Sequence, residues 1–451
     1  LTYTGNGASS RAISHALGSV PGVIIIKQTS GSSENWIVFH RSISNSSNGK
    51  NLFLNTNDAE NDMGGKFDQS NLPTSQTFTI GNDNSVNANG STYVAYLFAH
   101  NNGDGEFGPD ADQDIISCGS YTGNGSATGP VITLGWEPQW ILLKESSGAN
   151  DWFIVDVMRG IPSGLADSLR TLNANWNVAE NVEYAIDLKG TGFQIKDNHQ
   201  EINNSGDTYI YMAIRAPMIT EPEAATDVFA LSFARSAEDG KKPEYRSGFP
   251  VDMRLTGIVG SGASSYPTVG SRLTGIRYMT SHNDAAENNW TAQTWDYNNG
   301  FMNTAANTEN TDLFSYMFKR AKGYFDVVAY NGNGTAGRTV AHSLGVTPEM
   351  MWVKSRNSGV QSWRVYNASL GATHALNLNG DNAAFALSRG WNNTAPTNSS
   401  FTVGDAGSTN DSSQTYIAYL FATLAGISKV GSVAHSGSST DVDCGFSNGA
   451  R

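Results

Sequence analysis

Apolar residues along the chain come in short blocks that polar, glycine-rich segments separate. In the first hundred residues these blocks lie at 23–27, 36–40, 52–54, 78–80 and 93–98. β-Branched and aromatic residues dominate the blocks, and Gly, Asn, Ser or Pro bounds each one, which is typical of β-strands joined by turns. Helical periodicity over ten or more residues is almost absent. The pattern therefore predicts an all-β protein.

The sequence also repeats itself over a long period. The segment Tyr-Thr-Gly-Asn-Gly at residues 3–7 recurs at 121–125, and the close variant Tyr-Asn-Gly-Asn-Gly occurs at 330–334. Similar closing blocks occur at residues 92–98, 208–214, 313–318 and 415–421. The spacings of the opening motif are 118 and then 209 residues. Because the second is close to twice a unit of about 105 residues, a divergent repeat lies between the second and third copies. Four closing blocks indicate four repeats of about 100 residues each.

Repeats of this length with frequent short strands fit tandem antiparallel β-sandwiches, each made of two sheets, of the jelly-roll or concanavalin-like kind. We place repeat 1 at residues 1–100, repeat 2 at 121–218, the divergent repeat 3 at 219–322 and repeat 4 at 323–425. An acidic linker occupies residues 101–120. Residues 426–451 are interpreted as the start of a truncated fifth repeat, which predicts that the chain is part of a longer protein.

The residues that the repeats share are expected to have structural roles. Gly5 and Gly7 are placed in turns that need a positive φ, and Asn6 between them tolerates the same region. The shared prolines are expected to open edge strands, and the shared tryptophans to fill the core between the two sheets of each sandwich. These residues are Pro21, Pro138 and Pro348, and Trp36, Trp152 and Trp363. His15 and His342 occupy matching positions, but Ile132 takes that place in repeat 2, so we expect them to make structural hydrogen bonds.

Composition excludes several functional classes. The chain has 28 basic and 41 acidic residues, a net charge of −13, which disfavours binding to nucleic acid. No apolar run reaches the 18 residues of a membrane-spanning helix, so no membrane insertion is expected. Cys118 and Cys444 are too few for a disulfide framework or a zinc site and are interpreted as small buried residues.

One cluster could bind a metal. Five carboxylates gather in the acidic linker, where alternating side chains could offer hard oxygen ligands to calcium. They are Asp104, Glu106, Asp110, Asp112 and Asp114. The segment lacks the glycine of an EF-hand loop, and the alternative is a solvated linker without a metal. No other cofactor is indicated.

No catalytic motif stands out. A nucleophile elbow, a P-loop and a dinucleotide fingerprint are missing, and no strand carries the paired carboxylates of a sandwich-fold glycosidase. We therefore predict a protein that is not an enzyme. In divergent repeat 3, aromatic residues lie among polar ones and could stack on sugar rings, although the favoured alternative is that they form the core of that repeat. They are Tyr278, Trp290, Trp295 and Tyr297.

Taken together, several motifs resemble a known class of proteins. The opening motifs, the Leu-Gly-x-x-Pro steps, the segments at residues 92–99 and 152–160 and the linker at 101–119 are similar to repeat-bearing tail and tail-fibre proteins of marine tailed bacteriophages, including those infecting cyanobacteria. The resemblance implies an extracellular virion component of the tail that acts in host attachment, with other tail proteins and a host surface glycan or receptor as partners. Fibres of this kind are often homo-oligomers, commonly trimers. The alternatives are a carbohydrate-binding adhesin of a cell surface and, less favoured, a polysaccharide depolymerase.

Overall fold

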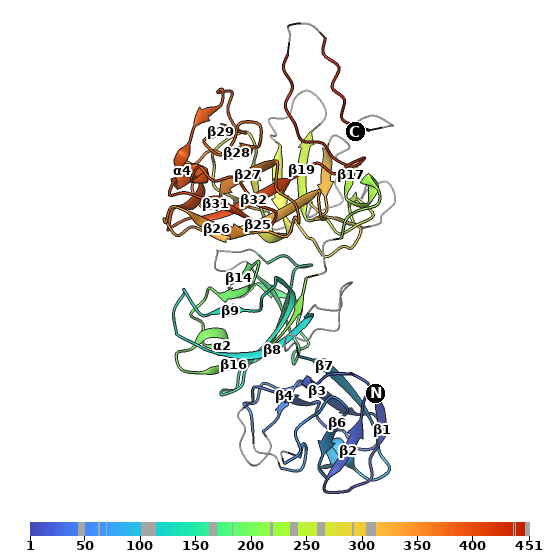
Figure 1. The fold of residues 1–451 in the computed structure, drawn as a ribbon. Coiled ribbons are helices and arrows are strands. Elements are labelled where there is room, and N and C mark those ends of the chain that lie inside the picture. The colour runs from blue at the N-terminus through green and yellow to red at the C-terminus, as the bar shows by residue number, and fades with distance from the viewer. Residues whose placement is uncertain are drawn as a thin grey trace. The chain divides into compact units, whose positions relative to one another are not determined.

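The computed structural model describes most of the chain and confirms an all-β protein built from antiparallel sheets (Figure 1). It describes residues 1–43, 50–61, 64–68, 70–100, 114–161, 169–182, 184–216, 220–234, 242–258, 267–290, 293–303, 313–435, 437 and 439–446. Two compact units form. Unit 1 comprises Leu1–Asp156, Leu169–Asp187 and Thr191–Ala216, and unit 2 comprises Val157–Ser168, Leu188–Gly190 and Pro217–Arg451. None of the described helices is long and apolar enough to span a lipid bilayer.

Repeat 1 and most of repeat 2 lie in unit 1. In repeat 1 the elements are β1 (Thr2–Thr4), β2 (Arg11–Ser14), β3 (Pro21–Gln28), β4 (Ile37–His40), β5 (Leu52–Phe53), β6 (Thr77–Ile80), α1 (Asn84–Asn87) and β7 (Thr92–Ala99). In repeat 2 they are β8 (Ile116–Thr122), β9 (Val131–Thr133), β10 (Pro138–Glu145), β11 (Trp152–Asp156), β12 (Arg170–Asn173), β13 (Asn181–Val182), β14 (Ile186–Lys189), β15 (Gly192–Ile195), α2 (Gln200–Asn203) and β16 (Thr208–Arg215).

Repeats 3 and 4 lie in unit 2. In repeat 3 the elements are η1 (Ala225–Asp227), β17 (Phe229–Phe233), β18 (Tyr245–Arg246), β19 (Met253–Ile258), β20 (Thr268–Ser271), η2 (Arg272–Thr274), β21 (Arg277–Thr280), β22 (Asn288–Asn289), β23 (Gly300–Phe301) and β24 (Leu313–Phe318). In repeat 4 they are β25 (Phe325–Asn331), β26 (Arg338–Ala341), β27 (Met350–Ser355), β28 (Arg364–Asn367), β29 (His374–Asn377), β30 (Phe385–Ala386), α4 (Ser388–Trp391), β31 (Ser400–Val403), α5 (Gly407–Asn410) and β32 (Thr415–Phe421).

The same strand order recurs in all four repeats. In each large sheet the last strand of the repeat lies between the first strand and the third strand. The fourth and later strands of the sheet then follow the third in chain order. The large sheets are β1-β7-β3-β4-β5, β8-β16-β10-β11-β12-β13, β17-β24-β19-β20-β21-β22 and β25-β32-β27-β28-β29-β30. A small sheet pairs the second strand with a strand late in the repeat, as in β2-β6, β9-β15, β18-β23 and β26-β31. Repeat 3 keeps this order although its sequence diverges.

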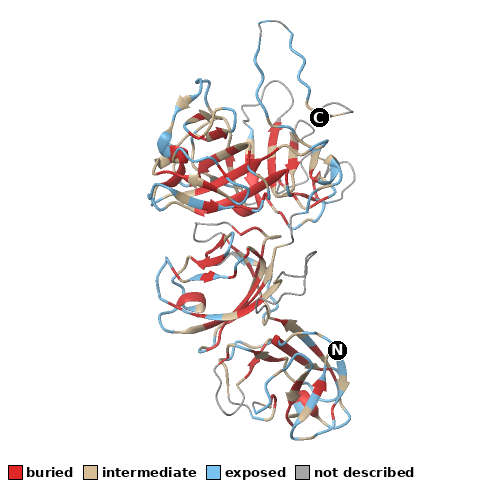
Figure 2. Ribbon diagram, in the orientation of Figure 1, coloured by how far each residue is buried: buried red, intermediate tan, exposed pale blue. Residues whose placement is uncertain are grey.

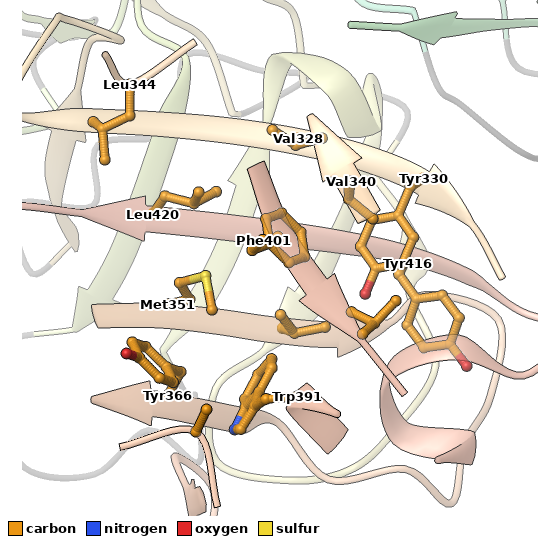
Figure 3. Close-up of a cluster of buried hydrophobic side chains, with 14 of the residues drawn as sticks. Val328, Tyr330, Val340, Leu344, Met351, Tyr366, Trp391, Phe401, Tyr416 and Leu420 are labelled. Atoms are coloured by element: carbon orange, nitrogen blue, oxygen red, sulfur yellow. The ribbon is translucent and has the colours of Figure 1, made fainter. Parts of the chain in front are cut away.

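The core of each repeat lies on the inner face of its large sheet, which faces the small sheet. In repeat 4, Val328, Met351, Tyr416 and Leu420 project from the large sheet toward Phe401 of β31 (Figure 3). A separate cluster forms the corresponding core of repeat 1, and another that of repeat 3. Buried residues accordingly concentrate on the strands, whereas the connecting loops are largely exposed (Figure 2).

In the three repeats that have it, the opening motif locks the start of the repeat to its end. Gly7 has a φ of 70°, as expected for a turn that needs a positive φ. Gly5 has a different role, because a Cβ atom there would lie 2.1 Å from the main-chain oxygen of Ala88. Asn87, at the end of α1, accepts a hydrogen bond from the Asn6 main-chain N–H at 3.0 Å and donates to the Gly81 carbonyl at 2.9 Å. The motif therefore builds the fold.

Two sequence expectations about strands need correction. Pro21 and Pro138 open β3 and β10, but these strands lie inside their sheets, and a register shift follows each proline. Such an irregularity accommodates a residue that has no N–H to donate.

In addition, β8 begins at Ile116, so the end of the predicted linker is already part of the repeat 2 sheet. No helix or strand forms in residues 426–435, where a fifth repeat was expected to begin.

Candidate binding surface

The predicted calcium site falls almost entirely outside the described residues. Asp104, Glu106, Asp110 and Asp112 belong to the segment 101–113, which the structure does not describe. Asp114 lies two residues before β8, and its main-chain oxygen accepts a hydrogen bond from Arg215 Nη1 at 3.4 Å. Among the described residues, no group of three or more His, Cys, Asp or Glu side chains could hold a metal ion. Calcium binding by the linker stays a prediction.

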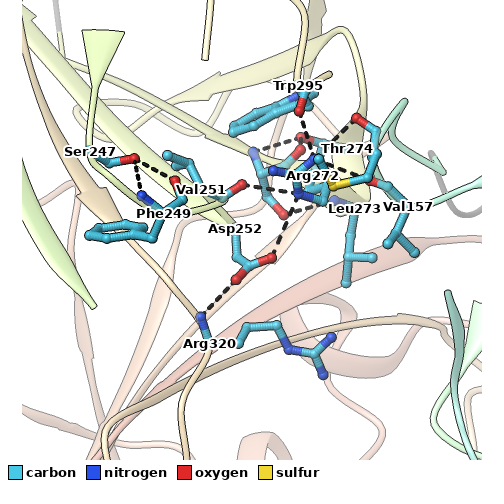
Figure 4. A network of polar contacts seen from close by, with 12 residues as sticks. Val157, Ser247, Phe249, Val251, Asp252, Arg272, Leu273, Thr274, Trp295 and Arg320 are labelled. Carbon is cyan, nitrogen blue, oxygen red and sulfur yellow. Dashed lines mark hydrogen bonds and ion pairs between the residues drawn. The ribbon is translucent and has the colours of Figure 1, made fainter. Parts of the chain in front are cut away.

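Trp295 is a core residue, which corrects its placement on a glycan-binding surface. Its side chain is 1% exposed, stacks on Phe301 at 5.5 Å and donates from Nε1 to the Gly275 carbonyl at 2.7 Å. Arg272 lies over its ring and donates to the Trp295 carbonyl at 2.8 Å (Figure 4). Asp252 is 3.7 Å from Arg272, and burial lowers the pKa of this guanidinium. A sugar cannot reach a ring enclosed in this way.

The other three predicted aromatic residues stay partly accessible. Tyr278 of β21 and Trp290, just after β22, are both half-buried and meet edge to face at 5.3 Å. Tyr297 is also half-buried, and its hydroxyl lies 3.0 Å from Met302 Sδ. The structure thus brings Tyr278 and Trp290 together at one edge of the large sheet of repeat 3 and separates them from the buried Trp295.

The outer faces of the large sheets pair inside each unit. In unit 1, a single apolar cluster joins Val23, Val38 and Leu52 of repeat 1 to Trp152 and Ile210 of repeat 2. The alternation of β3 explains this arrangement, because Ile24 and Ile26 point into the core of repeat 1 while Val23 and Ile25 face repeat 2. The β-strands of the large sheets are therefore apolar on both faces.

A tryptophan anchors the pairing in both units. Trp152 Nε1 donates to the Phe53 carbonyl of repeat 1 at 2.8 Å, and Trp363 Nε1 donates to the Thr280 carbonyl of repeat 3 at 2.9 Å. The two acceptors occupy equivalent positions in their sheets. Phe53 of β5 pairs with Ile37 of β4, and Thr280 of β21 pairs with Thr268 of β20 at the matching position. These tryptophans thus lie between repeats, which corrects the expectation that they fill the core of each sandwich.

A buried lysine accompanies each of these tryptophans. Lys144 and Lys354 are both fully buried, and burial lowers their pKa values to about 8. Lys144 Nζ donates to the Gly148 carbonyl at 3.0 Å, and Lys354 Nζ donates to the Ser358 carbonyl at 3.4 Å. Each ammonium thereby fixes the loop after its strand. These contacts are structural, as are those of His15 and His342, whose rings lie 3.2 Å from the carbonyls of Thr74 and Thr397.

His40 lies in the pairing interface of unit 1 and is wholly buried. Its Nε2 donates to the Tyr211 carbonyl of repeat 2 at 3.0 Å, and its Nδ1 accepts from the Ser42 main-chain N–H at 3.1 Å. Burial lowers the pKa of His40 from 6.5 to about 4. Nearby, Cys118 is buried as expected and burial raises its pKa to about 12, whereas Cys444 is half-exposed.

We expect the stability of unit 1 to fall as the pH drops from 6.5 to 4. In this range the unfolded state binds a proton that the buried His40 does not, so the folded state loses up to about 3 kcal/mol. Urea unfolding of wild type and of His40→Gln at pH 7 and pH 4.5 measures this term. The loss of unfolding free energy between pH 7 and pH 4.5 should be smaller in His40→Gln than in wild type. In His435→Gln, a control at an exposed histidine, the loss should equal that of wild type. Equal losses in all three proteins would contradict the assignment.

The pairing covers only part of each outer face. In repeat 1, Trp36 packs against the shared cluster, and Tyr96 stacks on its ring at 6.3 Å, with Lys27 Nζ 5.9 Å from the same ring. Tyr96 is 47% exposed. In repeat 3 the same part of the sheet carries an aromatic stripe in which Phe233 packs on Phe314 at 6.4 Å. Both odd-numbered repeats therefore present an aromatic surface to solvent.

The stripe of repeat 3 is an exposed apolar surface on two neighbouring strands. Leu231 is 53% and Phe233 41% exposed on β17, the edge strand of the sheet. Tyr316 pairs with Leu231 across the β17–β24 ladder, and Phe314 meets Tyr316 edge to face at 5.2 Å. Exposed apolar patches on soluble proteins commonly mark interaction sites. The alternation of residues 229–233 and 313–318 could have indicated this stripe from the sequence.

Comparison with known proteins gives a family but no relative of known function. A family described as a domain of unknown function (DUF7483) matches residues 1–217 and 267–448, which is most of the chain. The first matched range nearly coincides with repeats 1 and 2, which pair in unit 1. No curated protein and no solved structure matches the chain.

Proposed function

The chain belongs to the DUF7483 family, described as a domain of unknown function, and from this premise we propose that it is a non-enzymatic structural and adhesive protein of a phage tail. In this proposal the four repeats are copies of one β-sandwich of about 100 residues, of the jelly-roll or concanavalin-like kind. They form a structural, rod-like part of a tail fibre or tail-associated assembly, located on the virion and outside the cell.

One observation carries the structural part of the proposal. The same pairing of outer sheet faces, with a tryptophan donating to an equivalent carbonyl, is built twice in one chain, by Trp152 and by Trp363. Proteins assembled from repeats that bury a shared surface gain stability from each neighbouring contact. Together with the sequence motifs that resemble phage tail proteins, this construction supports an extended, repetitive assembly role.

The uncovered aromatic surfaces support the adhesive part. The stripe that contains Leu231 and Phe233 is suited to contact with a neighbouring tail protein, since it is apolar and contains no charged side chain. Tyr278 and Trp290 present a half-buried aromatic pair next to the polar Asn288 and Asn289, a combination that suits stacking and hydrogen bonding to a host surface sugar.

Location in the particle is the first test. We expect mass spectrometry of purified phage particles to detect the chain in several copies per virion, and antibody labelling to place it on the tail. Detection only in the host cell envelope would instead support a cell-surface carbohydrate-binding adhesin.

Binding to host polysaccharide is the second test. We expect Trp290→Ala to weaken binding on a glycan array at least tenfold while its melting temperature stays within a few degrees of wild type. Trp176→Ala, at a tryptophan of repeat 2 that is 59% exposed, should bind as wild type does. Undiminished binding by Trp290→Ala would remove this site. New reducing ends released from the polysaccharide would favour a depolymerase.

A further inference from the structure

In repeats 1, 2 and 4 the main-chain N–H of the shared tryptophan donates to the side-chain oxygen of an asparagine in a later loop. The pairs are Trp36 with Asn55 at 2.8 Å, Trp152 with Asn175 at 2.9 Å and Trp363 with Asn379 at 2.9 Å. The residue after the asparagine differs, and is Thr56, Trp176 or Gly380. Repeat 4 thus combines this hydrogen bond with an Asn-Gly step, in which no side chain hinders the approach of the following main-chain nitrogen to the asparagine amide.

The other Asn-Gly steps among the described residues are held by main-chain hydrogen bonds. In the three opening motifs the glycine N–H donates to the carbonyl of the buried asparagine that ends the short helix, from Gly7 to Asn87 at 2.8 Å, from Gly125 to Asn203 at 2.9 Å and from Gly334 to Asn410 at 2.8 Å. Two further glycine N–H groups donate in the same manner, from Gly90 to the Gly5 carbonyl at 3.0 Å and from Gly332 to the Gln414 carbonyl at 2.8 Å. At the step Asn299-Gly300, the Asn299 carbonyl accepts from the N–H groups of Ser247 and Gly248. A peptide fixed in this way is not free to turn its nitrogen toward a side chain.

The peptide between Asn379 and Gly380 has no such restraint. It lies in the loop between β29 and β30, where Gly380 is exposed to solvent. Among the described residues, none accepts from the Gly380 N–H or donates to the Asn379 carbonyl. The side-chain amide is instead held at both ends, since its Oδ1 accepts from the Trp363 N–H and its Nδ2 donates to Ser362 Oγ at 3.4 Å. The structure therefore leaves the attacking nitrogen free and orients the group that it would attack.

The Trp363 N–H is placed to assist an attack on this amide. When the Gly380 nitrogen adds to Asn379 Cγ, negative charge develops on Oδ1. A main-chain N–H that already donates to this oxygen stabilises the charge, as the donors of an oxyanion hole do. Ser362 Oγ lies beside Nδ2, the atom that leaves as ammonia.

We propose that Asn379 is a site of spontaneous covalent modification, at which the chain converts its own asparagine to aspartate and isoaspartate. The Gly380 nitrogen loses its proton and bonds to Asn379 Cγ, the Cγ–Nδ2 bond breaks, and ammonia leaves with a proton, which closes a succinimide ring. Water then opens the ring at Cγ to give aspartate, or at the main-chain carbonyl carbon to give isoaspartate. Water is the only other reactant. This inference goes beyond the proposed function and does not depend on it, because it concerns the purified chain whatever its location.

Conversion acts on the contact between repeats 3 and 4. The Trp363 side chain is fully buried, and its Nε1 donates to the Thr280 carbonyl of repeat 3 at 2.9 Å. Isoaspartate adds one carbon to the main chain and so displaces the oxygen that holds the Trp363 N–H. We expect aged wild type to melt at a lower temperature than fresh protein, and aged Gly380→Ala to melt as it did when fresh. Unchanged melting after full conversion of wild type would contradict this effect on Trp363.

Peptide mapping by mass spectrometry of protein kept in mildly alkaline buffer tests the site. We expect Asn379 to convert at least tenfold faster than Asn6, Asn124 or Asn333 of the opening motifs, and than Asn175. In guanidinium chloride, which removes the main-chain hydrogen bonds, the asparagines of the opening motifs should convert about as fast as Asn379. Equal rates for Asn379 and Asn333 in the folded protein overturn the proposal.

Gly380→Ala tests whether the glycine nitrogen is the attacking group. Gly380 has no positive φ, and a Cβ atom there would come no closer than 3.4 Å to Asn377 Cβ, so the variant is expected to fold. We expect conversion of Asn379 to be at least tenfold slower in this variant, because the added methyl group hinders the nitrogen. Gly359→Ala, at another exposed glycine of repeat 4, should convert as wild type does. A Gly380→Ala protein that is folded by circular dichroism and converts at the wild-type rate overturns the proposal.

Discussion

Replacing Trp152 by alanine is expected to lower the free energy of unfolding of unit 1 by about 3 to 5 kcal/mol. The side chain is 2% exposed and lies in the apolar cluster shared by repeats 1 and 2, so its removal leaves a large cavity between the two sheets. The Phe53 carbonyl also loses the hydrogen bond from Trp152 Nε1. Urea unfolding followed by intrinsic fluorescence and by circular dichroism measures the change.

The control for this substitution is Trp176→Ala, since Trp176 belongs to the same repeat and is 59% exposed. We expect a change within about 0.5 kcal/mol for this variant. If Trp152 anchors the pairing, its loss should also separate the unfolding of repeat 1 from that of repeat 2, so that two transitions replace one. A single transition with a loss below about 1 kcal/mol would show that the sheets pair without this anchor.

The second large effect is expected for Asn410→Ala in repeat 4, with a loss of about 3 kcal/mol. Asn410 is fully buried at the end of α5. Its Nδ2 donates to the carbonyls of Gly404 at 2.7 Å and Thr335 at 2.9 Å, and its Oδ1 accepts from the Asn333 main-chain N–H at 3.0 Å. Alanine would leave these main-chain groups without their partner, and the Gly404 carbonyl among them is buried.

Thermal and urea unfolding of Asn410→Ala against Asn382→Ala, at an exposed asparagine of the same repeat, measures this loss. The control should unfold as wild type does. Asn410→Asp is informative as well, because it keeps the acceptor but loses the donors. An Asn410→Ala protein as stable as the control would mean that water replaces the missing bonds at no cost.

The strands of this protein could be predicted from sequence because each is a short β-branched or aromatic block between turn residues. The blocks at 23–27 and 93–98 correspond to β3 and β7, and the divergent repeat was recognised from the block that forms β24. The roles of individual tryptophans could not be predicted in the same way. In β3 and β4 both faces are apolar, so alternation alone does not distinguish the core of a repeat from the contact between repeats.

The buried asparagines that hold the opening motifs in place could have been predicted from the sequence. Asn87, Asn203 and Asn410 each precede the tyrosine of a closing strand at the same spacing, and the structure shows all three fully buried. A polar residue repeated at a fixed distance from a strand signals a buried network, since exposed asparagines have no reason to keep such a spacing. The burial of Trp295 had no comparable signal, because it depends on the fold that brings Arg272 and Phe301 against its ring.

The pairing of repeats has a consequence for how such a protein changes length during evolution. Repeats 1 and 2 share one apolar cluster, and Trp363 of repeat 4 donates to Thr280 of repeat 3, so the smallest self-sufficient piece is a pair. Duplication or deletion of one repeat would leave an apolar sheet face without its complement, whereas duplication of a pair adds two matched faces at once. Selection on length should therefore favour steps of two repeats, or about 200 residues.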